Sequence, residues 1–133
     1  METATGSPPE ETPAARVSLS RSLDGELQDF FARELGVLGP TETHVIDDLI
    51  VVRCKGALSP AEIGIGATKA GRLLVKEVTE KSCHKIEPSL GRLLQKATGV
   101  PLHELRVGLF WKRGEKVFLL HMSDKVNVEK DTR

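Results

Sequence analysis

Two adjacent acids, Asp47 and Asp48, are the residues of this 133-residue chain that most resemble a catalytic or metal-binding pair. Neighbouring residues on a strand point to opposite faces of a sheet, so their carboxylates converge poorly on one proton or one metal ion. Asp also tolerates the left-handed backbone that a two-residue hairpin turn requires. We therefore expect Asp47 and Asp48 to turn the chain between two strands.

The neighbours Cys83 and His84 could form a thiolate with its general base. However, neighbours on a helix do not face each other, and no third group is evident to orient the histidine. We expect Cys83 and the distant Cys54 to be buried free thiols. No two ligand candidates stand at a spacing that zinc sites favour. The sequence thus indicates no catalytic residue, no metal ion and no cofactor, and it favours a protein that is not an enzyme.

Three glycines, Gly64, Gly66 and Gly71, superficially resemble a phosphate-binding loop. Here the G-x-G follows a helix start rather than a strand, and the last step is five residues rather than three. Neither a dinucleotide fingerprint nor a P-loop is completed. An enzyme or small-ligand-binding module around Cys54 or this glycine-rich helix start stays open as an alternative function, and it predicts an enclosed pocket with converging polar groups.

A basic cluster with two aromatic neighbours is the candidate interaction surface: Phe110, Trp111, Lys112, Arg113 and Lys116. Aromatic rings beside cations on a sheet can stack nucleic-acid bases. The 19 basic residues balance the 19 acidic ones, which argues against a strong electrostatic attraction to nucleic acid. Nucleic-acid binding by this cluster is therefore an alternative function. The cluster could equally be a hairpin tip whose charged side chains are simply solvated.

A helix is expected at the start of the domain, because apolar residues recur there at three- and four-residue steps. They are Leu19, Leu23, Leu27, Phe30, Phe31 and Leu35. Residues 1–17 have almost nothing to bury, so we expect a disordered tail. The predicted domain is residues 18–123, and residues 124–133 are expected to be a flexible C-terminal tail.

Two strands are expected on either side of the acid pair, at residues 41–47 and 49–55. The run Leu49 to Val52 is apolar at every position, which is typical of a strand covered on both faces. A helix would cover one face, and a second subunit could cover the other. We therefore expect a homodimer.

A strong helix start follows at Ser59-Pro60-Ala61-Glu62, with Ser as N-cap, Pro at the first helical position and Glu completing a capping box. The glycines that follow predict a short first turn and a restart near Thr68. From there Leu73, Leu74, Val75 and Val78 form an apolar stripe. Pro88 predicts a kink or a break.

A second hairpin is expected at residues 102–111 and 116–122, turned near Gly114. The order is then helix, hairpin, kinked or split helix, hairpin. We predict an α+β domain in which helices pack on one face of a four-stranded antiparallel sheet.

The run from Ile46 to Gly56, continued by Leu58 to Glu62 and Gly71 to Val78, resembles the MpsC-like family over about residues 18–122. These small proteins, long described as a domain of unknown function, are named for a Na-translocating, membrane-potential-generating system. This chain departs from the family pattern at Leu109-Phe110-Trp111, which is more apolar. The positions that carry the resemblance are structural: Asp47, Asp48, Arg53, Gly56, Ser59, Pro60, Glu62, Gly71, Pro88 and Gly114.

The resemblance implies an accessory or regulatory protein that binds a protein partner of a membrane system for cation translocation or inorganic-carbon transport. It supplies no catalytic residues. Uninterrupted apolar runs such as Leu49 to Val52 are far shorter than the roughly 20 residues of a membrane span. The first residues also lack the features of a signal peptide. We therefore expect a cytoplasmic protein that reaches the membrane only through its partner.

Overall fold

The computed structural model describes residues 13–126, with side chains from residue 22 onward. The elements in chain order are α1 (Pro13–Leu35), β1 (Thr41–Ile46), β2 (Leu49–Cys54), α2 (Pro60–Ile65), α3 (Lys69–Thr98), β3 (Leu102–Phe110) and β4 (Glu115–Met122). This order confirms the predicted α+β class. The expected split of the second helical region lies between α2 and α3.

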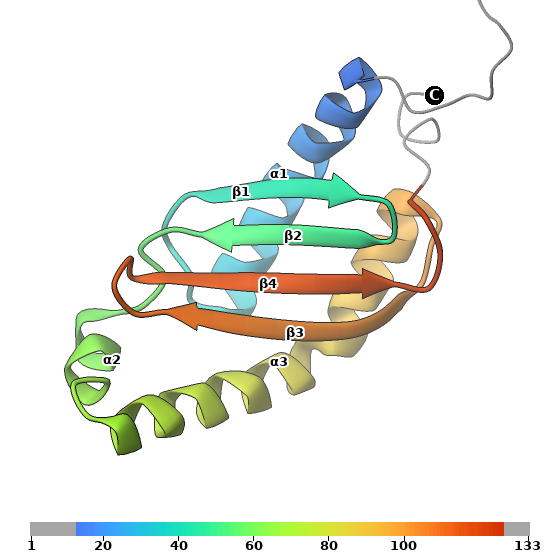
Figure 1. Cartoon of the computed structure of the whole chain (residues 1–133). Coiled ribbons are helices and arrows are strands. Elements are labelled where there is room, and N and C mark those ends of the chain that lie inside the picture. The colour runs from blue at the N-terminus through green and yellow to red at the C-terminus, as the bar shows by residue number, and fades with distance from the viewer. Residues whose placement is uncertain (1–12, 127–133) are drawn as a thin grey trace, which may run out of the picture.

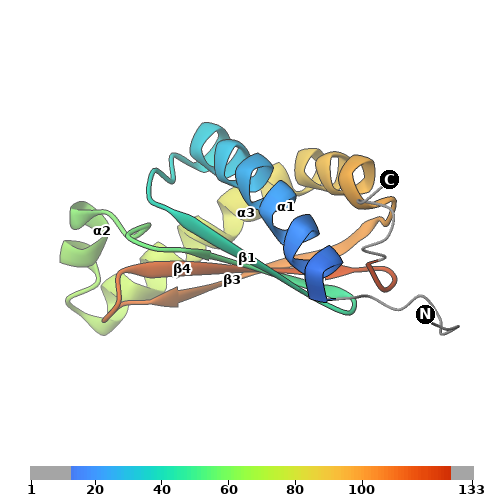
Figure 2. The same ribbon diagram turned by 90° about the horizontal axis from the view of Figure 1, so that it is seen from above.

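The four strands form one antiparallel sheet in the order β1-β2-β4-β3 (Figure 1). The two most apolar strands, β2 and β4, therefore lie in the centre. α1 and α3 both pack on one face of the sheet, as the view from above shows (Figure 2). The opposite face, which we call the open face, carries no described helix.

The core lies between the helices and the sheet. Phe31 of α1 stacks on Phe118 of β4 with ring centroids 4.4 Å apart, and both side chains are fully buried. α1 begins at Pro13, so residues 13–17 are helical, and the predicted start of the domain at residue 18 is too late. The rest of the predicted tail, residues 1–12, lies outside the described residues. Gly36 ends α1 with a φ of 70°, which suits a residue without a side chain.

Asp47 and Asp48 form the predicted tight turn, because Ile46 pairs with Leu49 on either side of them. Asp47 adopts a φ of 54°, the left-handed conformation that Asp tolerates. Its carbonyl accepts a hydrogen bond from the N–H of Val126 at 2.9 Å, and the Val126 side chain is fully buried. The ordered part of the domain thus reaches residue 126 rather than ending at 123. The rest of the predicted C-terminal tail, residues 127–133, lies outside the described residues.

The capping box at Ser59 is present as predicted. The Ser59 hydroxyl accepts from the N–H of Glu62 at 3.1 Å, and the Glu62 carboxylate accepts from the N–H of Ser59 at 2.9 Å. α3 restarts at an N-cap, Thr68, and continues unbroken through Pro88. A break at Pro88 is therefore wrong. Figure 1 shows α3 changing direction in its second half, where its buried Leu90 and Leu94 keep it on the sheet.

Candidate functional site

The predicted basic and aromatic residues gather at the turn between β3 and β4. Gly114 completes that turn with a φ of 65°, as its position in the sequence indicates. A surface groove of about 610 Å³ lies there. It is lined by Arg72, Leu109, Phe110, Trp111, Lys112 and Arg113. We call Arg72, Phe110, Trp111, Lys112 and Arg113 the turn surface.

The turn surface is fixed to the corner between α2 and α3. Trp111 packs so closely on Gly66 that a Cβ atom at Gly66 would overlap the indole ring. Arg72 donates a hydrogen bond to the Gly66 carbonyl oxygen at 3.0 Å. The N–H of Leu58 also donates to the carbonyl of Gly114 at 3.1 Å. Two segments distant in the sequence thus form one rigid corner.

Lys116 does not belong to this surface, which corrects the sequence-based assignment. Its side chain is 11% exposed, and its Nζ lies 3.2 Å from the Glu62 carboxylate. Lys116 occupies the same face of β4 as the buried Phe118 and Leu120, because alternate residues of a strand share a face. That alternation is the sequence signal that could have placed Lys116 inside.

Glu62 has a lowered pKa although burial alone would raise it. The hydrogen bond from the Ser59 N–H and the charge of Lys116 together outweigh the effect of burial. The pair Glu62–Lys116 therefore joins α2 to β4 as an ion pair. It is a structural bond that helps to hold the corner under the turn surface.

The glycines that resemble a phosphate loop are explained by packing. Gly66 leaves room for Trp111, and a Cβ atom at Gly71 would overlap the carbonyl oxygen of Ile65. Gly71 therefore allows the start of α3 to approach the end of α2 closely. Both positions lie within the corner, and their function there is steric.

The corner carries most of the exposed apolar side chains of the described chain. Of the eight large exposed hydrophobic residues, six lie on α2, the first turns of α3 or the end of β3. They are Ile63, Ile65, Leu73, Leu74, Val78 and Phe110. Leu73, Leu74 and Val78 belong to the apolar stripe that the sequence pattern predicts. In the structure this part of α3 extends beyond the sheet (Figure 1), so only Val75 and Thr79 of these turns are buried.

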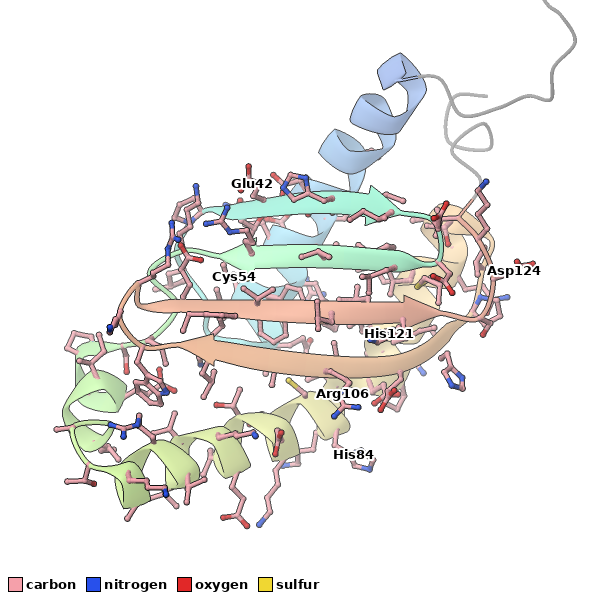
Figure 3. The ribbon with its side chains drawn as sticks, in the orientation of Figure 1. Glu42, Cys54, His84, Arg106, His121 and Asp124 are labelled. Carbon is pink, nitrogen blue, oxygen red and sulfur yellow. The ribbon has the colours of Figure 1, made fainter. Side chains whose placement is uncertain are left out.

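The two cysteines are buried free thiols, as predicted. Burial raises the pKa of Cys54 to about 12 and that of Cys83 to about 11. Both thiols are therefore protonated at neutral pH, which opposes a nucleophilic role. His84, the neighbour of Cys83, lies on the exposed side of α3 (Figure 3).

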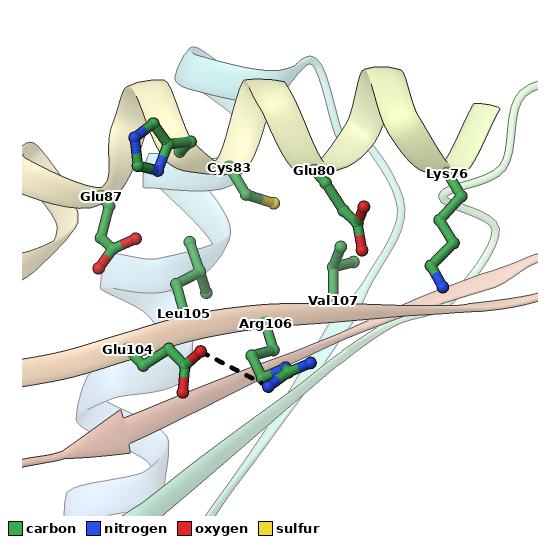
Figure 4. Close-up of a pocket in the computed structure, with 9 residues that line it drawn as sticks. Lys76, Glu80, Cys83, Glu87, Glu104, Leu105, Arg106 and Val107 are labelled. Atoms are coloured by element: carbon green, nitrogen blue, oxygen red, sulfur yellow. Dashed lines mark ion pairs between the residues drawn. The ribbon is translucent and has the colours of Figure 1, made fainter. Parts of the chain in front are cut away.

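A second hollow of about 280 Å³ lies between α3 and β3 (Figure 4). Cys83 points into it, and Glu80 and Glu87 of α3 flank the thiol. On the strand side Glu104 and Arg106 form an ion pair at 3.5 Å. Over the described residues, no three His, Cys, Asp or Glu side chains gather in a way that could hold a metal ion.

Arg53, one of the positions that carry the family resemblance, joins three strands. Its guanidinium lies 3.2 Å from the carboxylate of Glu42 on β1 and 3.2 Å from that of Glu115 on β4. Because Glu115 is itself buried, its charge requires this partner. Glu115 could not be identified from the sequence, because it comes close to Arg53 only through the register of the folded sheet, which pairs Arg53 with Val117 of β4.

Within residues 13–126, no helix combines the length and the apolar composition that crossing a bilayer requires. No solved structure matches this chain. An uncharacterised protein of Bacillus subtilis (strain 168), YbcI, is 28% identical over 91 residues, which cover 67% of this chain and 73% of YbcI.

The family model described as "Na+-translocating membrane potential-generating system (MpsC)" matches residues 15–124. This range includes all four strands and nearly all of the three helices of the described structure. The chain therefore belongs to the MpsC family, as the resemblance of its first hairpin and helix start indicates.

Proposed function

We propose that this protein is a non-catalytic accessory component of a membrane-potential-generating system, and that it binds a protein partner of that system through the turn surface. The family description supports the link to such a system. The observation that carries the binding role is an exposed apolar groove with three cationic side chains on a rigid corner. We place the protein in the cytoplasm, at the membrane only through its partner.

The chemistry of the groove defines the partner. Phe110 and Trp111 offer aromatic surface, and aromatic and Arg side chains dominate the binding energy of many protein interfaces. Arg72, Lys112 and Arg113 line this apolar centre, and the Arg113 guanidinium also lies 3.6 Å from the Glu115 carboxylate. The complementary partner presents apolar side chains flanked by carboxylates. A concentrated exposed apolar patch of this kind is typical of an interaction site.

Reversing the charges of Lys112 and Arg113 tests whether the turn surface binds a protein partner. In cells of the native source, the Lys112→Glu/Arg113→Glu variant should sediment with the membrane fraction at least about tenfold less than the wild type, because like charges would face each other. The matched control is Arg92→Glu/Lys125→Glu, which changes the net charge equally at exposed positions away from the turn. The control should sediment like the wild type.

Two outcomes would contradict a protein partner. Equal binding to protein-free vesicles of anionic lipid, lost in the Lys112→Glu/Arg113→Glu variant, would indicate that the turn surface binds the lipid surface itself. Salt-sensitive co-purification of nucleic acid through Lys112 and Arg113 would instead support the nucleic-acid-binding alternative. Circular dichroism of each variant separates loss of binding from loss of fold.

A further inference from the structure

The two central strands carry apolar side chains on both faces. On the helix side, Ile50 and Val52 of β2 and Phe118 and Leu120 of β4 are fully buried. On the open face, Leu49 and Val51 of β2 and Val117 and Leu119 of β4 are only half-buried. The described chain therefore covers one apolar side of the sheet and leaves the other in contact with water.

The strand register joins these side chains into one surface. Val51 pairs with Leu119 across the sheet centre. On the edge strand β1 this surface continues to Ile46, which is 51% exposed. On β3 it continues to Phe110, whose ring lies so close to Gly108 that a Cβ atom there would approach it to 3.2 Å. The apolar surface thus crosses all four strands.

The charges around this surface are already neutralised within one molecule. Arg53 pairs with Glu42 and Glu115, and Arg106 pairs with Glu104. The open face therefore offers no large unbalanced charge to a strongly acidic or basic partner. It can meet a copy of itself without net repulsion.

We propose that the open face is the interface of a homodimer, in which two sheets pack face to face around a twofold axis parallel to the strands. This axis places β2 of one copy over β4 of the other, so that Val51 lies over Leu119 of the second copy. Sheets packed in this way lie about 10 Å apart, a spacing that interdigitated apolar side chains fill. A twofold interface is self-complementary, as this pairing requires.

The same axis makes the edges of the face complementary in charge. It places β1 over β3 of the second copy, so that Glu42 lies over Gly108, two residues along the strand from Arg106, and His44 lies over Arg106 itself. Figure 3 shows these two side chains at opposite edges of the sheet, as this arrangement needs. The axis also places both turn surfaces at the same end of the dimer, where they could bind two partner segments together.

The test is the mass of the purified full chain by light scattering at micromolar concentrations. The wild type should have twice the 14.5 kDa mass of the chain. Leu119→Lys should be a monomer, because a charge would then lie at the apolar centre of the interface. The control is Leu38→Lys, at a residue that is 86% exposed and lies outside the open face, and it should remain a dimer.

The orientation has its own test. Glu42→Arg and Arg106→Glu should each weaken the dimer, and the double variant should restore it. A monomeric wild type would overturn the proposal, as would a dimer that survives Leu119→Lys. So would a double variant whose dimer dissociates more readily than the dimers of both single variants. A monomer in which residues outside 13–126 protect position 119 from solvent would show that the chain covers its own face. Melting curves confirm that each variant is folded.

Discussion

At the scale of single residues, the chemically suggestive side chains of this protein serve mainly to position its surface. Asp47 and Asp48 turn the chain, and the two thiols are buried and protonated. Trp111 is the residue on which the candidate site depends, since it locks the β3–β4 turn to Gly66. The sequence could indicate the acid turn because it is local. It could not indicate the contact between Trp111 and Gly66, which only the tertiary fold brings together.

Gly66→Ala tests that contact. The added Cβ atom would overlap the Trp111 ring, and overpacking of this kind costs about 1–3 kcal/mol. We expect a lower free energy of unfolding and a shift of Trp111 fluorescence to longer wavelength. Trp111 is the one tryptophan of the chain, so the signal is specific.

Gly64→Ala is the matched control for this variant. A Cβ atom at Gly64 meets open space, and Ala favours a helix over Gly by about 0.5–1 kcal/mol. This variant should be as stable as the wild type or more so, with unchanged fluorescence. Equal effects of both substitutions would mean that the Trp111 contact does not hold the corner.

At the scale of elements, local sequence signals predicted the helix starts correctly. They did not predict which apolar side chains of a helix are exposed. The capping box of α2 and the restart at Thr68 follow from residues within one turn of each other. The burial of α3 does not, because Leu73, Leu74 and Val78 have the spacing of a core stripe and yet extend beyond the sheet. A helical pattern specifies a face, but only the length of the neighbouring sheet decides how much of that face is covered.

The bond between α2 and β4 should depend on pH. Because the pKa of Glu62 is lowered in the folded state, its ion pair with Lys116 stabilises the protein above the ordinary value of 4.5. That contribution is lost as the pH falls through the lowered pKa. Glu62→Gln should therefore melt at a lower temperature than the wild type at pH 7, with a loss of about 1 kcal/mol for this partly exposed pair.

The difference in melting temperature between Glu62→Gln and the wild type should shrink when the curves are repeated in acid, well below pH 4.5. Glu80→Gln, at an exposed carboxylate of α3, is the control and should follow the wild type at every pH. A difference between Glu62→Gln and the wild type that stays constant from neutral to acidic pH would rule out the charge of Glu62 as its source.

At the scale of the whole molecule, the fold class and the family were accessible from the sequence, and the domain limits were not. Pro13 and Val126 lie beyond the predicted limits. Pro13 belongs to an N-terminal extension of α1, and Val126 is held by its hydrogen bond to Asp47, which is distant in the sequence. The described residues present two neighbouring surfaces, which share Phe110 at the end of β3. The open face suits a second copy, and the turn surface suits an acidic and apolar partner segment.

Site-specific photo-crosslinking in cells of the native source can show whether the turn surface binds a membrane protein. A photoreactive amino acid at position 112, in the turn surface, should form an adduct with a membrane protein through a segment rich in carboxylates. The same amino acid at position 92, on the exposed side of α3, should not form it. No adduct with a membrane protein at position 112, or the same adduct from both positions, would contradict a partner-binding role for the turn surface.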